Sequence, residues 1–340
     1  MKNLIIYQLG ILVCLSLFSC KKNHSQPNAV PVDPSAEVLI AGDYTPAGKF
    51  ESAAYWKDGT FVPLEDGTAA VSQATSIIKY NGKIYVGGNY NNKACIWEDG
   101  VRISIEDNYP GKIYGFAFYQ ESGSNYLVLY GEKGSLQKPA THAFVMKFDN
   151  KSIFFEDITS NTSSAYGFVS IPGSVRVAGK SDGHAVQWII GGQKIDLGES
   201  YDIVAGFKAY VGSVHLCGDR KNSTTNLYES GYWKNITFFK LGNNSEMNLS
   251  DIDLDAQGNI YLVGYSKGAD LENHATFWEK GAPFVLSNNS SRATAVTSFN
   301  GNRYIAGREL AEACYWLNKQ LILLKTPNSV ATAIYVSAKN

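Results

Sequence analysis

The tryptophans of this chain recur inside one short phrase. All six follow a small residue by three positions, as in SAAYW (52–56), KACIW (93–97) and EACYW (312–316). A seventh copy, HAFVM (142–146), carries Met146 in place of tryptophan. A small side chain at a fixed distance from a large one is typical of closely packed neighbouring sheets. The phrase therefore predicts a repeated structural unit with a large apolar side chain in each interface.

A hydrophobic run that ends in glycine precedes every copy of the phrase. The glycines are Gly42, Gly87, Gly131, Gly179, Gly218, Gly264 and Gly307. They are about 39–48 residues apart, which is the length of a four-stranded propeller blade. In the second repeat we expect strands at 74–80, 83–88, 94–98 and 101–105, joined by tight turns at Asn-Gly (81–82) and Asp-Gly (99–100).

The fold class predicted from these repeats is all-β: a seven-bladed β-propeller of four-stranded antiparallel blades over residues 37–340. The propeller begins with a second-strand sequence, EVLIAG (37–42), and ends with a first-strand sequence, VATAIYVSA (330–338). We therefore expect the C-terminal strand to complete the first blade and close the ring, which removes the open sheet edges that favour aggregation.

Two stretches resemble known repeat families. Residues 255–264, DAQGNIYLVG, resemble the D-x-x-G-N-x-Y-x-x-G repeats of bacterial β-propellers. The YVGG run followed by a tryptophan strand resembles Kelch repeats, although only Gly87-Gly88 keeps a doubled glycine. The resemblance covers residues 37–338 and implies the architecture. It brings no catalytic residues with it.

The N-terminus reads as a targeting segment. Lys2 precedes a mostly apolar stretch from Leu4 to Phe18, and LFSC (17–20) follows the Leu-x-small-Cys pattern of a lipobox. The segment resembles a bacterial lipoprotein signal peptide over residues 1–19, which implies lipidation of Cys20. Residues 20–36 then read as the lipidated cysteine and a flexible tether. This implies membrane anchoring in the cell envelope, with the outer membrane expected; the alternative is an ordinary secretory signal cleaved nearby.

Charge and cysteine content narrow the range of partners. Thirty Lys and Arg stand against 31 Asp and Glu, a net charge of −1, so nucleic acid is not an expected partner.

We expect Cys95, Cys217 and Cys314 to be buried free thiols rather than a disulfide framework. We expect a monomer, and we predict neither a cofactor nor catalytic residues.

The acidic run Asp251-x-Asp253-x-Asp255 is spaced like part of a calcium loop. Ala256 and Leu262 stand where an EF-hand needs Gly and Glu, so no metal site is predicted. Strand alternation instead puts the three carboxylates on one face, where they would line the central channel if the strand is innermost. Whether they hold a cation stays open.

The loops provide the functional hypothesis. Joins from first to second and from third to fourth strands read as tight, whereas the other two classes read as long and emerge on one face. Because function concentrates on loops held by a rigid scaffold, we expect a glycan or a protein surface to bind at that face. The residues predicted to bind lie at or just past the second-strand glycines: Asp43, Tyr90, Glu132, Asp182, Asp219, Tyr265 and Arg308.

Two other functions are compatible with this sequence. Asp43, Glu132 and Asp219 could serve as acid–base residues of a glycosidase or lyase, although spacing along the chain does not pair them. The protein could also be a structural subunit of an outer-membrane assembly. Two carboxylates in one cleft would favour the enzyme, and an apolar patch on the rim would favour a protein partner.

Overall fold

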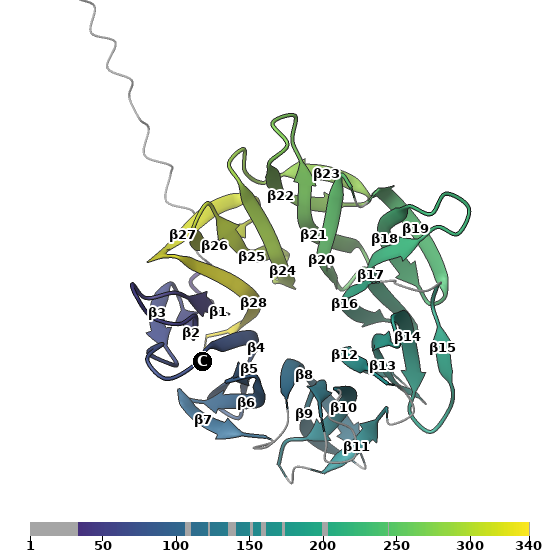
Figure 1. Ribbon diagram of the computed structural model, residues 1–340, viewed down its shortest axis with the longest axis horizontal. Coiled ribbons are helices and arrows are strands. Elements are labelled where there is room, and N and C mark those ends of the chain that lie inside the picture. The colour runs from purple at the N-terminus through teal and green to yellow at the C-terminus, as the bar shows by residue number, and fades with distance from the viewer. Residues whose placement is uncertain are drawn as a thin grey trace, which may run out of the picture. The chain divides into compact units, whose positions relative to one another are not determined.

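The computed structural model describes residues 33–339 except 106–109, 122, 135–140, 150–151, 158–160, 172–173, 199–202 and 244. The elements of these residues are strands β1 to β28, which form seven four-stranded antiparallel sheets arranged as blades in a ring (Figure 1). No helix among the described residues is long and apolar enough to cross a membrane. The predicted seven-bladed propeller is confirmed.

Each blade runs from an innermost strand at the ring axis to an outermost strand at the rim. Blade 1 contains β28 (Ser329–Ala338), β1 (Ala36–Tyr44), β2 (Ser52–Lys57) and β3 (Thr60–Pro63). Blade 2 contains β4 (Ser72–Tyr80), β5 (Lys83–Tyr90), β6 (Lys93–Glu98) and β7 (Val101–Ser104). Blade 3 contains β8 (Gly111–Glu121), β9 (Ser124–Lys133), β10 (His142–Lys147) and β11 (Ile153–Glu156). Blade 4 contains β12 (Ser163–Ile171), β13 (Ser174–Ser181), β14 (His184–Ile189) and β15 (Lys194–Asp196).

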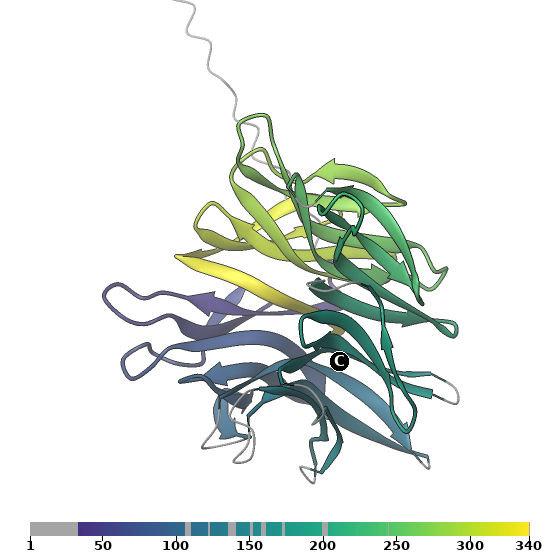
Figure 2. The same ribbon diagram turned by 45° about the vertical axis from the view of Figure 1, so that its right-hand side comes forward.

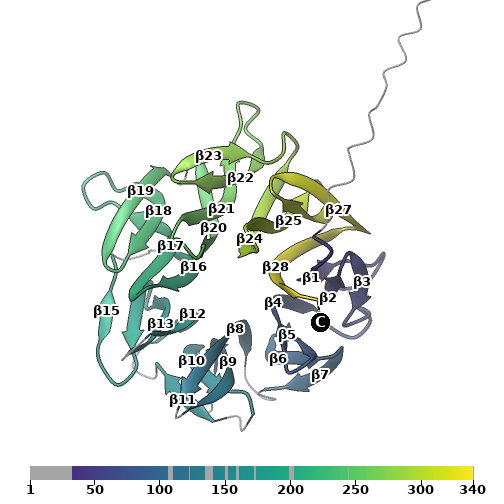
Figure 3. The same ribbon diagram turned by 180° about the vertical axis from the view of Figure 1, so that it is seen from behind.

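The remaining three blades complete the ring (Figure 3). Blade 5 contains β16 (Ile203–Tyr210), β17 (Ser213–Lys221), β18 (Tyr228–Lys234) and β19 (Thr237–Asn243). Blade 6 contains β20 (Met247–Leu254), β21 (Ile260–Lys267), β22 (Asn273–Glu279) and β23 (Ala282–Val285). Blade 7 contains β24 (Ser291–Phe299), β25 (Asn302–Glu309), β26 (Glu312–Leu317) and β27 (Gln320–Pro327).

The C-terminal strand closes the ring as predicted. β28 pairs antiparallel with β1, from Ala36 opposite Ala338 to Tyr44 opposite Ser329. In Figure 1 the yellow β28 accordingly lies beside the purple β1. Blade 1 is thus built from both ends of the described chain, and β1 has a backbone partner on each side, β28 and β2.

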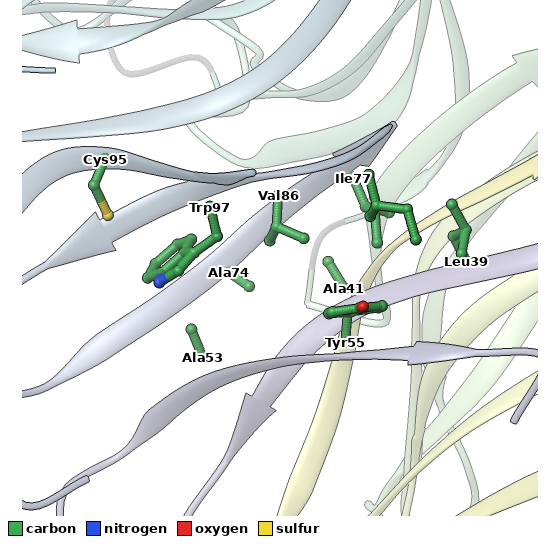
Figure 4. Close-up of a cluster of buried hydrophobic side chains, with 10 residues drawn as sticks. Leu39, Ala41, Ala53, Tyr55, Ala74, Ile77, Val86, Cys95 and Trp97 are labelled. Atoms are coloured by element: carbon green, nitrogen blue, oxygen red, sulfur yellow. The ribbon is translucent and has the colours of Figure 1, made fainter. Parts of the chain in front are cut away.

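The repeated tryptophans fill the interfaces between blades. Trp56, Trp97, Trp233 and Trp316 are fully buried. In Figure 4 the Trp97 indole of blade 2 lies with Ala53 of blade 1 in one cluster of buried side chains. Indole N–H groups also reach the preceding blade: Trp97 Nε1 donates to Glu65 Oε1 at 3.0 Å and Trp56 Nε1 to Thr326 Oγ1 at 3.1 Å.

The small residue of each repeated segment lies beside the first residue of the next innermost strand. The backbone N–H of Ala53 donates to the Ser72 hydroxyl of the next innermost strand at 2.9 Å. The same contact recurs between Ala143 and Ser163, Ala275 and Ser291, and Ala313 and Ser329. A larger side chain would separate the blades and break this bond, which explains the demand for a small residue.

The repeated glycines are required by a β-bulge that every blade contains. In blade 2, Ala74 pairs with Gly88 and Ser76 pairs with Gly87, so Thr75 is an extra residue on the innermost strand. The bulge brings the Gln73 carbonyl so close that a Cβ on Gly88 would lie 1.8 Å from its oxygen. Gly88, and not Gly87 as predicted, is therefore the repeat glycine of blade 2. Because blade 2 has two consecutive glycines, the sequence alone did not show which of them lies opposite the bulge.

The loop prediction was wrong for three blades. Long second-to-third joins occur at 45–51, 134–141, 222–227 and 268–272. The equivalent joins at 91–92, 182–183 and 310–311 are two-residue turns. Asn91, Asn92 and Asp182 have positive φ, which Asn and Asp tolerate and which such tight hairpins require. We call the face that carries the second-to-third joins the long-loop face, and the opposite one the tight-turn face.

Candidate functional site

A central channel runs along the ring axis and is lined by the bulged residues. One bulged residue comes from each blade: Thr332, Thr75, Tyr114, Tyr166, Ala205, Ser250 and Thr294. All of them line a cavity of about 410 Å³. The Thr332 hydroxyl is shared between the carbonyl oxygens of Ala41 in its own blade, at 3.2 Å, and Ala74 in the next, at 2.6 Å. These channel hydroxyls are therefore engaged in holding blades together.

The acidic run on β20 divides between three environments. Asp251 lines the channel, and its carboxylate accepts the N–H groups of Ile252 at 2.8 Å and Val296 at 2.9 Å. Burial raises the pKa of Asp251 to about 6, although the nearby Lys208 amine opposes this shift. Asp253 pairs with Lys208 at 3.3 Å. Asp255 lies beyond the end of β20 and pairs with Arg303 at 3.0 Å.

The expectation of three channel-lining carboxylates on one strand face is thus wrong for Asp255. That residue closes the β20–β21 turn, where its carboxylate also accepts the Asn259 N–H at 2.9 Å. Among the described residues, no group of three His, Cys, Asp or Glu side chains is placed to hold a metal ion. Cys95, Cys217 and Cys314 are buried free thiols.

One residue in each blade follows the repeat glycine and lies toward the long-loop end of the second strand. We call them the mouth residues: Asp43, Asn89, Glu132, Lys180, Asp219, Tyr265 and Arg308. Five of the seven residues predicted to bind a ligand occupy this position. Tyr90 and Asp182 do not, because the repeat glycines of their blades are Gly88 and Gly179.

Tyr90 and Asp182 have structural contacts instead. The Arg102 guanidinium lies 3.4 Å from the centroid of the Tyr90 ring, within the same blade. Asp182 begins the β13–β14 turn, and its carboxylate accepts the N–H groups of Asn161 at 2.9 Å and Thr162 at 3.3 Å.

Three acidic mouth residues contact the next blade. Asp43 is 5% exposed and accepts the Ala74 N–H at 2.7 Å. Glu132 accepts the Ser164 hydroxyl. Asp219 accepts the Asn248 amide at 3.4 Å. These carboxylates therefore connect neighbouring blades, whether or not they also contact a ligand.

Arg308 differs from the acidic mouth residues because its side chain is exposed and makes no ion pair or side-chain hydrogen bond with any described residue. It lies opposite Arg292 in the β24–β25 register. Both side chains, with that of Tyr265, line a cavity of about 530 Å³ between blades 6, 7 and 1. The Arg292 guanidinium lies 5.6 Å from the centroid of the Tyr265 ring. Like charges directly opposite in a sheet are destabilising unless a bound anion compensates them.

Arg292 was missed from the sequence because it belongs to the first strand of its blade. The signal that could have found it is the serine that begins several innermost strands, since Ser291 is followed at once by Arg292. Pairing Arg292 with Arg308 additionally requires the bulge, which shifts the register by one residue.

A smaller cavity, of about 230 Å³, adjoins the 530 Å³ cavity through Arg308. It lies between blades 7 and 1 and is lined by residues that include Asp43 and Glu51. Both carboxylates accept hydrogen bonds from blade 2, from the Ala74 N–H and the Gln73 amide. Burial raises the pKa of Asp43 to about 7; the Ala74 N–H opposes this shift and the Glu51 charge adds to it. The Asp43 carboxyl group therefore changes its charge near neutral pH.

Asp43→Asn is expected to change the pH dependence of stability. Because the folded pKa lies near 7 and the reference value is 3.8, the contribution of Asp43 is fully present below about pH 4 and is lost as pH rises through about 7. Asn keeps an acceptor for Ala74 but cannot ionise. Chemical denaturation should show the variant gaining stability relative to wild type as pH rises from about 4 to about 7. A constant difference across this range would mean that Asp43 titrates normally.

Comparison with known proteins supports the fold and goes no further. No family model matches the chain, and no curated protein sequence matches it. Among solved structures, it is similar to Pyrococcus horikoshii acylaminoacyl peptidase, with a TM-score of 0.51 and 12% identity over 85% of this chain and 51% of that one. A puromycin-hydrolyzing peptidase from Mycobacterium tuberculosis gives a TM-score of 0.50 and 10% identity over 85% of this chain and 55% of that one.

The extracellular domain of a putative hybrid two-component system from B. thetaiotaomicron also matches, with a TM-score of 0.50 and 11% identity over 84% of this chain and 38% of that one. The chain thus spans about half or less of the length of these three proteins. Similarity at such low identity establishes the propeller architecture alone.

Proposed function

We propose that this protein is a lipid-anchored binding module of the bacterial cell envelope. The lipidated Cys20 holds it at a membrane, and the long-loop face of the propeller recognises a ligand that carries an anionic group. The chemistry of that group is a carboxylate, phosphate or sulfate, because the planar arginine fork matches these anions.

The observation that carries this proposal is the Arg292–Arg308 pair. Two guanidinium groups occupy opposite positions in β24 and β25, and Arg308 has no acidic partner among the described residues. Tyr265 borders the same cavity and adds an aromatic surface. The acidic mouth residues are hydrogen-bonded to neighbouring blades. The basic pair is therefore the part of this face that we expect to contact a ligand.

The direction in which the chain enters the propeller supports the choice of face. β1 begins at Ala36, which lies opposite Ala338 at the tight-turn face. Its other end, Tyr44, reaches the long-loop face. Figure 2 shows the ring obliquely, turned by 45° from the view of Figure 1. A tether attached before Ala36 therefore joins the propeller at the face opposite to the arginines.

Replacing Arg308 with glutamine is expected to weaken anion binding by at least about tenfold without loss of stability. Removing one of two opposed like charges should leave the free energy of unfolding unchanged or raise it by about 0.2–1 kcal/mol. Binding can be measured by calorimetry against polyglutamate, inorganic phosphate and a sulfated glycan. Lys234→Gln is the matched control, because it removes one exposed charge at the tight-turn face.

The wild-type protein should bind at least one of these anions, and added salt should weaken the binding. Equal binding by wild type, Arg308→Gln and Arg292→Gln would contradict the proposal. So would failure of the wild-type protein to bind any of the three probes.

The Asp43 cavity favours a second function, a glycosidase or lyase. Two acidic residues line it, Asp43 with a raised pKa and Glu51, and a pair of carboxyl groups is what acid–base hydrolysis of glycosides uses. The test is a screen of polysaccharides for cleavage, with Asp43→Asn and Glu51→Gln as inactive variants. Cleavage that persists in both variants would exclude these residues as its catalytic pair.

A further inference from the structure

Large apolar side chains are exposed on the long-loop face of four consecutive blades. They lie in the second-to-third joins of blades 5, 6, 7 and 1: Leu227 is 60% exposed, Leu271 80%, Leu310 58% and Phe50 51%. We call these four residues the apolar arc. Its two middle blades, 6 and 7, also carry Tyr265, Arg292 and Arg308. Single exposed apolar residues need no explanation, but a series along one rim marks an interaction surface.

Two leucines of the arc also have an unfavourable backbone conformation. Leu271 has φ of 66° and Leu310 has φ of 54°. A left-handed backbone costs a branched side chain free energy that Gly or Asn does not lose, and this chain places Gly, Asn or Asp at most of its other left-handed positions. Leucine at these two tips is thus unfavourable both for its backbone and for its exposure, which a buried contact with a partner would offset.

We propose that the apolar arc docks a protein partner whose surface combines acidic side chains with an apolar one. This inference rests on the proposed function, since the acidic groups would pair with Arg292 and Arg308 while the apolar group packs against Leu271 and Leu310. The partner is a protein, because glycans offer no aliphatic side chain for the leucines.

The other occupants fit less well. A second copy packed face to face would bring its own arginine pair to the same interface, and like charges would oppose each other there. A membrane is disfavoured because the tether joins the propeller at the tight-turn face, opposite to the arc. Charge and orientation together therefore select an acidic protein surface.

The test measures binding of the full-length protein to short synthetic peptides that combine a glutamate pair with a leucine or phenylalanine. Matched peptides replace either the acidic or the apolar residues with serine. Binding should require both kinds of residue, and the affinity should fall at least about tenfold in Leu271→Asn/Leu310→Asn. Because Asn suits a left-handed backbone, this double variant should fold at least as stably as wild type.

Val211 supplies the matched control. It is 85% exposed with φ of 41°, but it lies in the β16–β17 turn on the tight-turn face. Val211→Asn therefore makes the same chemical change and should leave peptide affinity unaltered. An equal loss of affinity in Val211→Asn and the leucine variants would overturn the assignment to the arc.

The remaining outcomes separate this inference from the proposed function. If polyglutamate binds through Arg308 but the leucine variants bind every peptide normally, anion recognition stands and the protein-docking inference fails. If anionic vesicles bind and the leucine variants abolish that binding while the peptides do not bind, the arc contacts lipid and the inference fails. Self-association lost in the leucine variants would assign the arc to a second copy and also overturn it.

Discussion

Removal of β28 is expected to abolish the cooperative unfolding transition of the protein. A chain that ends at Asn328 lacks the innermost strand of blade 1, so the whole inner edge of β1 loses its backbone partners. It also loses the Thr332 hydroxyl that joins blade 1 to blade 2. Thermal unfolding followed by circular dichroism, together with limited proteolysis, would measure the effect. A protease-resistant core of unchanged size would contradict the prediction.

A circular permutant provides the control for this truncation. Ala36 and Ala338 are paired, and the Lys339 N–H donates to the Ser35 carbonyl at 2.6 Å. The segment 329–338 can therefore be moved in front of Ala36 through a short turn. This permutant keeps every strand and should fold, but it should unfold faster because the chain no longer closes the ring covalently. If truncation and permutation are equally harmful, connectivity rather than the missing strand is the cause.

Replacing Trp97 with alanine is expected to lower the free energy of unfolding by about 3–5 kcal/mol. The indole is fully buried between blades 1 and 2, and its N–H donates to Glu65 Oε1 at 3.0 Å. The substitution opens a cavity in the interface and leaves that carboxylate without one of its donors. Denaturant titration would measure the loss, and Trp97→Phe should cost less because the ring is kept.

Trp97→Ala should leave ligand binding by the folded fraction unchanged, since Trp97 lies in the blade interface and not among the mouth residues. A normal free energy of unfolding combined with a selective loss of binding would contradict both its structural role and the position of the site.

The fold was predictable because the packing of each blade requires the same residue types at the same spacing in every repeat. Each blade interface needs a large apolar side chain, a small residue beside the next blade and a glycine below the bulge. Trp97 and Ala94 meet the first two needs in blade 2, and the third was read one residue early, at Gly87 instead of Gly88. Closure by the last strand could be predicted because the chain starts and stops in mid-blade.

The site was less predictable, because it depends on register and on hydrogen bonding between blades. Asp43 looks like a free acidic residue in the sequence, yet its carboxylate bonds to Ala74 of the next blade. Arg308 was found from its place after a glycine, whereas its neighbour Arg292 belongs to another strand and is brought beside it only by the bulged pairing. Patterns within one repeat predict the strands of a blade. Which side chains remain available to bind a ligand depends on contacts between blades, which those patterns do not show.

Blade 1 has a mechanical consequence for an anchored protein. β1 runs from Ala36 at the tight-turn face to Tyr44 at the long-loop face, between β28 on one side and β2 on the other. Under the proposed function, a force applied between the N-terminal end of β1 and a partner bound at the long-loop face would act along the axis of this strand. Its hydrogen bonds to both neighbours would then be loaded in shear and together, instead of being opened one after another. A tethered propeller of this design resists detachment best in the direction in which its partner pulls.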